Sequence, residues 1–226
     1  MLVAVTRPEI DGERTARALR ARGHDVLLAP LMRVEPIAAG LAGDWSALAI
    51  TSANALTALG DEVAPLRHLP IFAVGRRSAD AAQGFANVHS ADGDVRDLAE
   101  LIAAEHGSGR VLYLAGEDRA ADLIAELTAR GVAADMRIVY RAVTAPYPHD
   151  LTASLKAGRI DAVLHFSKRS AENYLAGARD AGILQAALAP RQLCLSAQVA
   201  EPLRAAGAAR IAIAPQPDEA SLLYLL

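Results

Sequence analysis

The sequence predicts an α/β protein with two similar lobes, each built on a parallel sheet flanked by helices. Short apolar runs rich in β-branched residues alternate with amphipathic stretches along the chain. Such alternation is typical of parallel sheets that helices cover on both faces. The second half of the chain also repeats motifs of the first half in the same order, and two extended stretches, 33–37 and 137–146, lie between the repeated blocks.

The chain opens with a β-strand–helix–strand unit. Residues 2–8 form a short apolar run and are expected to be a buried strand. Residues 10–25 place apolar side chains among charged ones, which is typical of an amphipathic helix, and the helix is expected to end at Gly23. A second strand is expected at 25–31.

The same two patterns continue to the end of the chain. Further strands are expected at the apolar runs 44–51, 69–75, 110–116, 160–167, 191–197 and 209–215. Helices are expected at the amphipathic stretches 52–63, 77–86, 95–107, 118–131 and 170–182. The stretches 33–37 and 137–146 are β-branched, end near proline and are expected to be extended linkers.

An internal repeat supports the two lobes. Residues 3–23 align with 111–131, which places Ala21-Arg22-Gly23 on Ala129-Arg130-Gly131. The motifs LAITSANALTAL and IFAVGRRSADAA are followed in the second half by VLHFSKRSAENYL and LCLSAQVAEPLR. Chance similarity between alanine-rich helices is the alternative, but matching order across three blocks favours a duplication. Two such lobes are expected to leave a cleft between them.

The composition argues against nucleic-acid and membrane partners. The net charge is −3 without a basic block, whereas nucleic-acid binding needs a clustered positive face. No stretch approaches the ~20 apolar residues of a membrane span, and the N-terminal residues do not resemble a signal peptide. Cys194 is the one cysteine, which fits a reducing compartment. We therefore expect a soluble, cytoplasmic protein.

Ligand contacts are expected where strands end and helices begin. In parallel α/β sheets, ligands lie beyond the carboxyl ends of the strands, where helix N-termini offer N–H groups to anions. Ser, Thr and Asn are also good N-caps, so capping alone is the alternative at each junction. Six such junctions together favour a polyanionic ligand: TRPE, TSAN, VGRRSA, AGEDR, FSKRSA and LSAQVA.

Several common chemistries have no motif in the sequence. No G-x-G-x-x-G follows the first strand and no G-x-x-x-x-G-K-S/T occurs, which argues against dinucleotides and P-loop nucleotides. The six histidines have no metal-ligand spacing, so no metal site is expected. His165 lies near Ser167 without a G-x-S-x-G elbow, which argues against a serine hydrolase. An enzyme of this sequence would act by positioning and hydrogen bonds.

The ordered motifs resemble the uroporphyrinogen-III synthase family over nearly the whole chain. They are VTRPE, ALRARGHDVLLAPL, ITSANAL, IFAVGRRSA, VYRA and FSKRSAENYL. The resemblance implies a lyase that converts hydroxymethylbilane into uroporphyrinogen III without a cofactor, in tetrapyrrole (porphyrin and haem) biosynthesis. The implied partners are the linear tetrapyrrole substrate and the upstream hydroxymethylbilane synthase. We expect a monomer.

The resemblance also implies that a two-stranded ladder joins the lobes. Lobe one would comprise residues 1–34 and 147–226, and lobe two residues 38–138. The extended stretches 33–37 and 137–146 would then be linker strands. In this arrangement the N-terminal β-strand–helix–strand unit is swapped between the halves of the chain, because it belongs to the same lobe as residues 147–226.

The chemistry that the resemblance implies is control of ring closure. Ring A of the substrate loses its hydroxyl to give an azafulvene, and ring D attacks through its substituted carbon to form a spiro intermediate. That intermediate reopens and closes again with ring D inverted, whereas the unaided chain closes without inversion to isomer I. Tyr140 matches the tyrosine of the family motif, and its phenol could hydrogen-bond the departing hydroxyl. Packing within a strand is the alternative for Tyr140.

The substrate is a polycarboxylate, and its contacts are expected at the junctions. Backbone N–H groups near Ser52-Ala53, Gly75–Ser78 and Ser167-Lys168 would hold carboxylates. Arg7 is the first choice of cation, with a surface ion pair as its alternative role. The expected substrate-binding residues are Thr6, Arg7, Ser52, Ala53, Asn54, Gly75, Arg76, Ser78, Ser167, Lys168 and Ser196.

The sequence departs from the family pattern at two junctions. Residues 75–78 keep the hydroxyl of a G-x-x-T motif, whereas the counterpart at 196–199 keeps neither its glycine nor its hydroxyl. Lys168 stands where the family has a proline and adds a cation. A non-catalytic two-lobed module that binds small anions or tetrapyrroles therefore stays open as the alternative. A receiver-type domain is disfavoured, because Thr6, Thr51 and Gly75 lie where it needs acidic residues.

Overall fold

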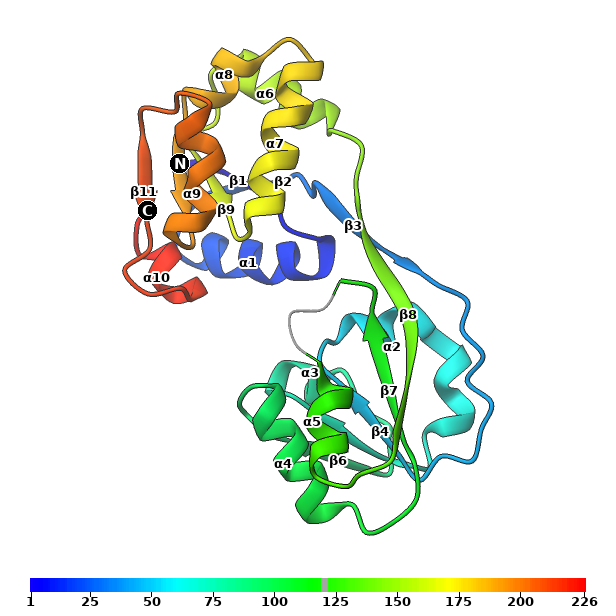
Figure 1. The fold of residues 1–226 in the computed structure, drawn as a ribbon. Helices are drawn as coiled ribbons and strands as arrows, with labels where there is room; N and C mark the ends of the chain where they lie inside the picture. Colours follow the sequence, from blue (N-terminus) through cyan, green and yellow to red (C-terminus); the bar gives the residue numbers. More distant parts are fainter. Residues whose placement is uncertain (119–121) are drawn as a thin grey trace. The chain divides into compact units, whose positions relative to one another are not determined.

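A computed structural model describes residues 1–118 and 122–226, and its chain divides into two compact units (Figure 1). The first unit comprises Met1–Arg33 and Val143–Leu226, and the second comprises Val34–Ala142. Within the described residues, the first unit has a five-stranded sheet and the second is built on a six-stranded one. The predicted class, α/β with parallel sheets flanked by helices, is confirmed.

The first unit's sheet joins strands from both ends of the chain. Its order is β11-β10-β9-β1-β2, and neighbouring strands pair in parallel. The strands are β1 (Leu2–Val5), β2 (Asp25–Leu28), β9 (Ala162–His165), β10 (Arg191–Cys194) and β11 (Ile211–Ile213). Val3 pairs with Ala162 and Val5 with Leu164, so the opening strand is completed by residues from the second half of the chain.

Helices cover both faces of this sheet. The helices of the unit are α1 (Glu9–Ala21), α6 (His149–Lys156), α7 (Lys168–Asp180), α8 (Leu184–Leu188), α9 (Ala197–Ala205) and α10 (Glu219–Leu223). Leu19 of α1 and Leu222 of α10 share one apolar cluster with Val3 and Val5. Helices α6 to α9 bury their apolar residues in a separate cluster on the other face, around Tyr174.

The second unit's sheet has the order β3-β8-β7-β4-β5-β6. Its strands are β3 (Met32–Pro36), β4 (Ala47–Ile50), β5 (Pro70–Ala73), β6 (Asn87–Ser90), β7 (Val111–Gly116) and β8 (Ala134–Thr144). Its helices are α2 (Asn54–Leu59), a 3-10 segment (Gly60–Leu66), α3 (Arg76–Asp80), α4 (Val95–Glu105) and α5 (Leu123–Ala129). Strands β4 to β8 pair in parallel, so their carboxyl ends meet at one edge.

The two stretches expected to be linkers overlap the strands β3 and β8. Residues 33–37 overlap β3, and 137–146 overlap β8, which begins earlier at Ala134. The division into units falls after Arg33 and after Ala142, within these strands. That these two strands form the linker between the lobes stays a prediction.

Several elements differ from those expected. The helix expected at 52–63 divides into α2 and the 3-10 segment, because Gly60 adopts a positive φ of 51°. The helix expected at 77–86 ends at Asp80, and the strand β6 that follows was not predicted. The helix expected at 118–131 appears as α5 from Leu123, and residues 119–121, with Arg119 of the AGEDR junction, lie outside the described residues. Among the helices described, none is long and apolar enough to cross a membrane.

A buried histidine lies at the end of β9. His165 is fully buried, and its Nε2 lies 2.8 Å from Oε1 of Gln192, while its Nδ1 has no hydrogen-bond partner among the described atoms. Its ring packs edge-on against Tyr174. Burial lowers the pKa of His165 from 6.5 to about 4, although the Gln192 contact opposes the shift.

The free energy of unfolding is therefore expected to fall as the pH drops below 6.5 toward 4. In that window the unfolded chain binds a proton at His165 that the folded chain does not bind. Between pH 7 and pH 5 the loss from this residue is about 2 kcal/mol. Urea unfolding at both pH values should show a smaller loss in His165→Gln. His149→Gln, at an exposed position, is the control and should keep the wild-type loss; equal losses in all three proteins would contradict this account.

Candidate active site

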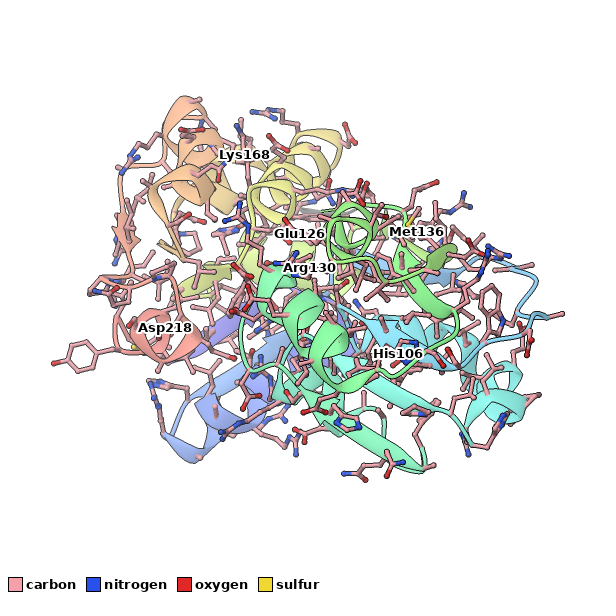
Figure 2. The ribbon with its side chains drawn as sticks, turned by 60° about the horizontal axis from the view of Figure 1, so that its bottom comes forward. His106, Glu126, Arg130, Met136, Lys168 and Asp218 are labelled. Atoms are coloured by element: carbon pink, nitrogen blue, oxygen red, sulfur yellow. The ribbon has the colours of Figure 1, made fainter. Side chains whose placement is uncertain are left out.

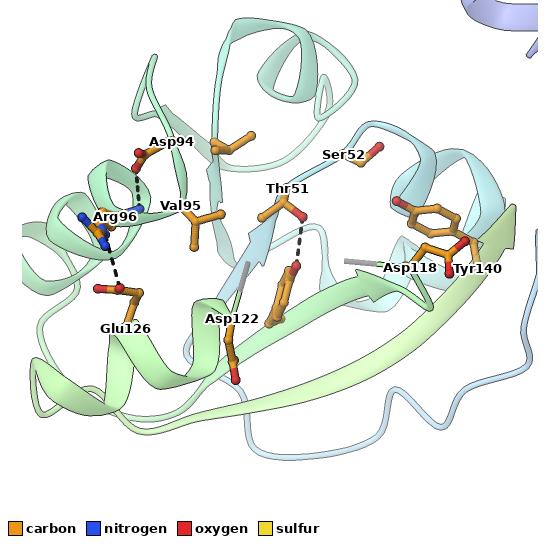
Figure 3. A pocket seen from close by; sticks show the side chains of 12 residues that line it. Thr51, Ser52, Asp94, Val95, Arg96, Asp118, Asp122, Glu126 and Tyr140 are labelled. Atoms are coloured by element: carbon orange, nitrogen blue, oxygen red, sulfur yellow. Dashed lines mark hydrogen bonds and ion pairs between the residues drawn. The ribbon is translucent and has the colours of Figure 1, made fainter. Parts of the chain in front are cut away.

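A cavity of about 650 Å³ opens at the carboxyl edge of the second unit's sheet (Figure 3). The residues that follow β4, β5 and β7 reach it, which is where ligands of parallel α/β sheets bind. It is lined by Thr51, Ser52, Val74, Asp94, Val95, Arg96, Tyr113, Gly116, Asp118, Asp122, Glu126 and Tyr140.

Tyr140 enters this cavity because of a bulge between β7 and β8. Ala115 pairs with Ile138, but Gly116 pairs with Tyr140, so Val139 is an extra residue and is buried in the core. A β-bulge of this kind re-aims the side chain that follows it. A Cβ atom on Gly116 would lie 2.5 Å from Cζ and 2.7 Å from the hydroxyl oxygen of Tyr140. The phenol thus lies directly against the backbone of Gly116.

A pair of hydroxyl groups lies in the same cavity. Oγ1 of Thr51 and the hydroxyl of Tyr113 are 2.9 Å apart, as Figure 3 shows by a dashed line. Tyr113 lies on β7 and is almost completely buried. Thr51 directly follows β4, so the pair connects the end of β4 with the middle of the neighbouring strand β7. Sequence reasoning did not select Thr51, Tyr113 or Gly116 as site residues, although Thr51 belongs to the quoted ITSAN motif.

One wall of the cavity is acidic. Asp94 caps α4 by accepting from the backbone N–H groups of Arg96 at 2.7 Å and Asp97 at 3.2 Å. Asp122 caps α5 and accepts from the N–H of Ala125 at 3.2 Å. The chain's own carboxylates therefore already occupy these two helix N-termini.

Arginines partly neutralise this acidic wall. Glu126 lies 2.6 Å from Arg130 and 3.6 Å from Arg96 (Figures 2 and 3). The carboxylate of Glu126, with a further contribution from Glu100, raises the pKa of Arg130 above its usual value, although burial acts in the opposite direction. Asp118 also lines the cavity, beside Tyr140 (Figure 3). The wall with Asp94, Asp122 and Glu126 is thus rich in carboxylates, and like charges repel.

The opposite side is formed by the junctions after β4 and β5. A hollow of about 300 Å³ shares Thr51, Ser52 and Val74 with the larger cavity and extends over the start of α3. Gly75 is the N-cap of α3 and provides no side-chain cap. The other residues that line the hollow are Ala53, Arg76, Arg77 and Ser78.

The expected binding residues in this hollow differ in their burial and in their own hydrogen bonds. The hydroxyl of Ser52 accepts from the N–H of Asn54 at 3.2 Å, and Ser78 is buried. Arg76 is exposed, and its Nε lies 3.0 Å from Oδ2 of Asp92. The hydrogen bond to Asp92 raises the pKa of Arg76, and bonds from Ser90 and Arg76 lower that of Asp92. The structure thus brings Ser52, Ala53, Gly75, Arg76, Ser78 and Tyr140 to the linings of these two hollows in the second unit, whereas Asn54, the first residue of α2, lines neither.

The other expected site residues belong to the first unit. Thr6 is fully buried and donates to the carbonyl of Leu164 at 2.9 Å, so its hydroxyl is used between β1 and β9. Ser167 and Ser196 act as N-caps, accepting from N–H groups at 3.1 Å and 3.4 Å. Lys168 lies 3.2 Å from Glu201. The side chains of Ser167 and Ser196 therefore have the geometry of N-caps, which is the alternative role given above for these junctions.

Arg7 lies at the carboxyl edge of the first unit's sheet, two residues after β1. Its side chain is 13% exposed, and its guanidinium carbon lies 4.1 Å from the centroid of the Phe166 ring. Nη2 is 3.5 Å from Asp11 and Nη1 is 3.5 Å from Glu219. Arg7 is thus held in ion pairs and stacked on an aromatic ring.

No cluster of His, Cys, Asp and Glu that could hold a metal ion occurs within residues 1–118 and 122–226. The chemistry that this geometry offers is hydrogen bonding from hydroxyls, phenols and backbone N–H groups, beside a wall rich in carboxylates.

Comparison with known proteins shows one family. A family model described as uroporphyrinogen-III synthase HemD matches residues 13–224. The crystal structure of uroporphyrinogen-III synthetase from Helicobacter pylori 26695 is 17% identical with a TM-score of 0.66, covering 99% of this chain and 96% of that chain. The wild-type uroporphyrinogen III synthase from the extremely thermophilic bacterium Thermus thermophilus is 21% identical with a TM-score of 0.47, covering 99% and 95%. No curated protein matches the sequence significantly.

Proposed function

The chain belongs to the uroporphyrinogen-III synthase family, and for its reaction we propose the residue roles given below. It is a lyase of tetrapyrrole biosynthesis that cyclises hydroxymethylbilane to uroporphyrinogen III. The match over residues 13–224 carries the assignment. The Helicobacter likeness shows that the fold is the same. We propose that the carboxyl edge of the second unit's sheet binds the substrate and that Tyr140 assists the loss of the ring A hydroxyl.

The position of Tyr140 supports this role. Its phenol lies in the cavity against Gly116, where a substrate can approach the hydroxyl. A phenol that donates to the ring A hydroxyl would help it leave as water and so favour the azafulvene. Because the azafulvene also forms without an enzyme, the protein's main contribution is to hold the rings so that ring D attacks through its substituted carbon.

The two walls of the cavity would orient the substrate carboxylates. Backbone N–H groups near Ser52-Ala53 and Gly75–Ser78, with Arg76, would bind carboxylates on the hollow's side. The wall with Asp94, Asp122 and Glu126 would keep carboxylates away. Such a one-sided arrangement favours one placement of a polycarboxylate over its reverse.

The first unit would supply further contacts. Arg7 and Lys168 are the proposed cations, and Ser167 and Ser196 the proposed hydrogen-bonding residues at the helix starts. The hydroxyl of Thr6 is bonded to the carbonyl of Leu164, so Thr6 would help to hold the ends of the strands in place and would not contact the substrate through its hydroxyl. We further propose a cytoplasmic monomer that receives its substrate from the upstream hydroxymethylbilane synthase, since free substrate closes unaided to isomer I.

Arg7→Ala is expected to raise KM for hydroxymethylbilane several-fold and to leave kcat nearly unchanged. A guanidinium that binds a carboxylate equally in substrate and transition state affects binding more than chemistry. Steady-state kinetics measure both constants, and Arg17→Ala, at an exposed position on the same helix α1, is the control. Wild-type kinetics in Arg7→Ala would assign Arg7 to an ion pair with no part in binding.

The overall function is tested with purified protein and hydroxymethylbilane in large excess. Separation of the product isomers should show many turnovers to isomer III without any added cofactor. The alternative, a module that binds a tetrapyrrole without converting it, predicts isomer I at the rate of a protein-free blank, together with measurable binding of the tetrapyrrole.

A further inference from the structure

Glu219 holds a position in the first unit that a ligand carboxylate would fit. Its Oε1 lies 2.5 Å from the hydroxyl of Thr15 and 3.5 Å from Nη1 of Arg7, and its Oε2 lies 2.7 Å from Nη2 of Arg14. Thr15 and both arginines come from the N-terminal part of the chain, whereas Glu219 opens α10 near its end. One carboxylate is thus bound by two guanidinium groups and a hydroxyl, which are groups that also bind the carboxylates of ligands.

Two of the three groups that bind Glu219, Arg7 and Thr15, are also held by other contacts. Arg7 is stacked on Phe166 and paired with Asp11, so its guanidinium stays in place when Glu219 leaves. The hydroxyl of Thr15 lies 3.1 Å from the carbonyl of Asp11 in its own helix. This hydroxyl has one proton, which it can give either to Glu219 or to that carbonyl. Departure of Glu219 therefore leaves no buried group unsatisfied at Thr15.

Glu219 can leave without the unfolding of α10. Asp218, labelled in Figure 2, caps the helix by accepting from the N–H of Ser221 at 2.8 Å. Leu222 and Leu223 anchor the helix in the apolar core beside Val3 and Val5. The side chain of Glu219 is itself 23% exposed, so its carboxylate can rotate into solvent while the backbone stays.

The charges of the cluster make exchange more favourable than addition. Arg7 and Arg14 carry two positive charges, and Asp11 and Glu219 carry two negative ones. A further carboxylate arriving at Arg7 would meet both acids at close range, and like charges at such separations repel. A carboxylate that replaces Glu219 keeps the balance.

We infer that Arg7, Arg14 and Thr15 form a binding site for one carboxylate of the tetrapyrrole substrate, and that Glu219 occupies this site until the substrate displaces it. The inference deepens the proposed function and rests on it. Arg7 lies just beyond a strand end, at the edge of a parallel sheet where ligands bind. Glu219 then acts as an internal competitor that weakens substrate binding.

Glu219→Gln tests this directly. The amide has the shape of the carboxylate without its charge, so it should compete less, and KM for hydroxymethylbilane should fall about three- to ten-fold with kcat within about two-fold. Glu13→Gln is the matched control, because Glu13 lies on the exposed side of α1, paired at 3.6 Å with Arg20. Its KM should equal that of the wild type.

A second pair of variants separates competition from a change in shape. In an Arg7→Ala background, Glu219→Gln should change KM by less than about two-fold, because coupled residues act non-additively. An unchanged or raised KM in Glu219→Gln, or the same decrease with and without Arg7, would overturn the inference. These outcomes are read from a protein that makes isomer III; a protein that makes none would instead refute the proposed function.

Discussion

Tyr140→Phe is expected to keep the fold and the isomer III product but to turn over about ten- to a hundred-fold more slowly, the usual range for one general acid. The substitution removes one hydroxyl and leaves the ring that packs against Gly116. The isomer should not change, because the geometry of closure depends on the whole cavity rather than on one proton donor. The measurement is kcat together with the isomer ratio and the melting temperature.

Tyr224→Phe is the matched control, because Tyr224 is 84% exposed. It should have wild-type kinetics. Full activity in Tyr140→Phe would show that Tyr140 contributes packing alone and that the enzyme acts purely as a conformational template.

Gly116→Ala is expected to lower kcat by about a hundred-fold, because a displacement of about 1 Å at a reacting group can cost that factor. The new Cβ would lie 2.5 Å from Cζ of Tyr140, and such a contact forces the ring to move. The phenol would then no longer face the substrate as in the wild type. Overpacking of this kind also lowers the free energy of unfolding by about 1–3 kcal/mol.

The comparison needs a glycine where an added methyl group meets open space. Gly107 has no atom within 4 Å of a built Cβ, so Gly107→Ala should keep its activity. Combining Gly116→Ala with Tyr140→Phe should cost little more than the worse single change, because both act through one phenol. Independent, multiplying losses would contradict the positioning of Tyr140 by Gly116.

The elements with strong apolar patterns could be predicted from the sequence. Strands β1 and β4 are uninterrupted apolar runs, and β9 is an apolar run that ends at His165; all three become fully or almost fully buried. Strand β6, with the sequence NVHS, has no such run and was missed; it is an edge strand whose pairing with β5 supplies the hydrogen bonds. The edge strands β2 and β11, which do carry apolar runs, were expected, so the apolar pattern rather than the position in the sheet decides what the sequence predicts.

The candidate site was predictable only in part. The junctions after β4 and β5 carry small and polar residues in the sequence itself, and they do line the hollow. The bulge at Gly116 depends on the pairing of β7 with β8, which no local pattern specifies. The partner of Arg7 lies on the last helix of the chain, so an ion pair with Glu219 could not be read from the VTRPE motif.

The isomer ratio, measured with enzyme in excess over hydroxymethylbilane, shows whether this chain controls the geometry of ring closure. Under these conditions every substrate molecule is bound before unaided closure competes. The account predicts that isomer III predominates and that it forms faster than isomer I does in a protein-free blank. Isomer I as the main product, formed at the blank rate while the protein remains folded, would contradict it.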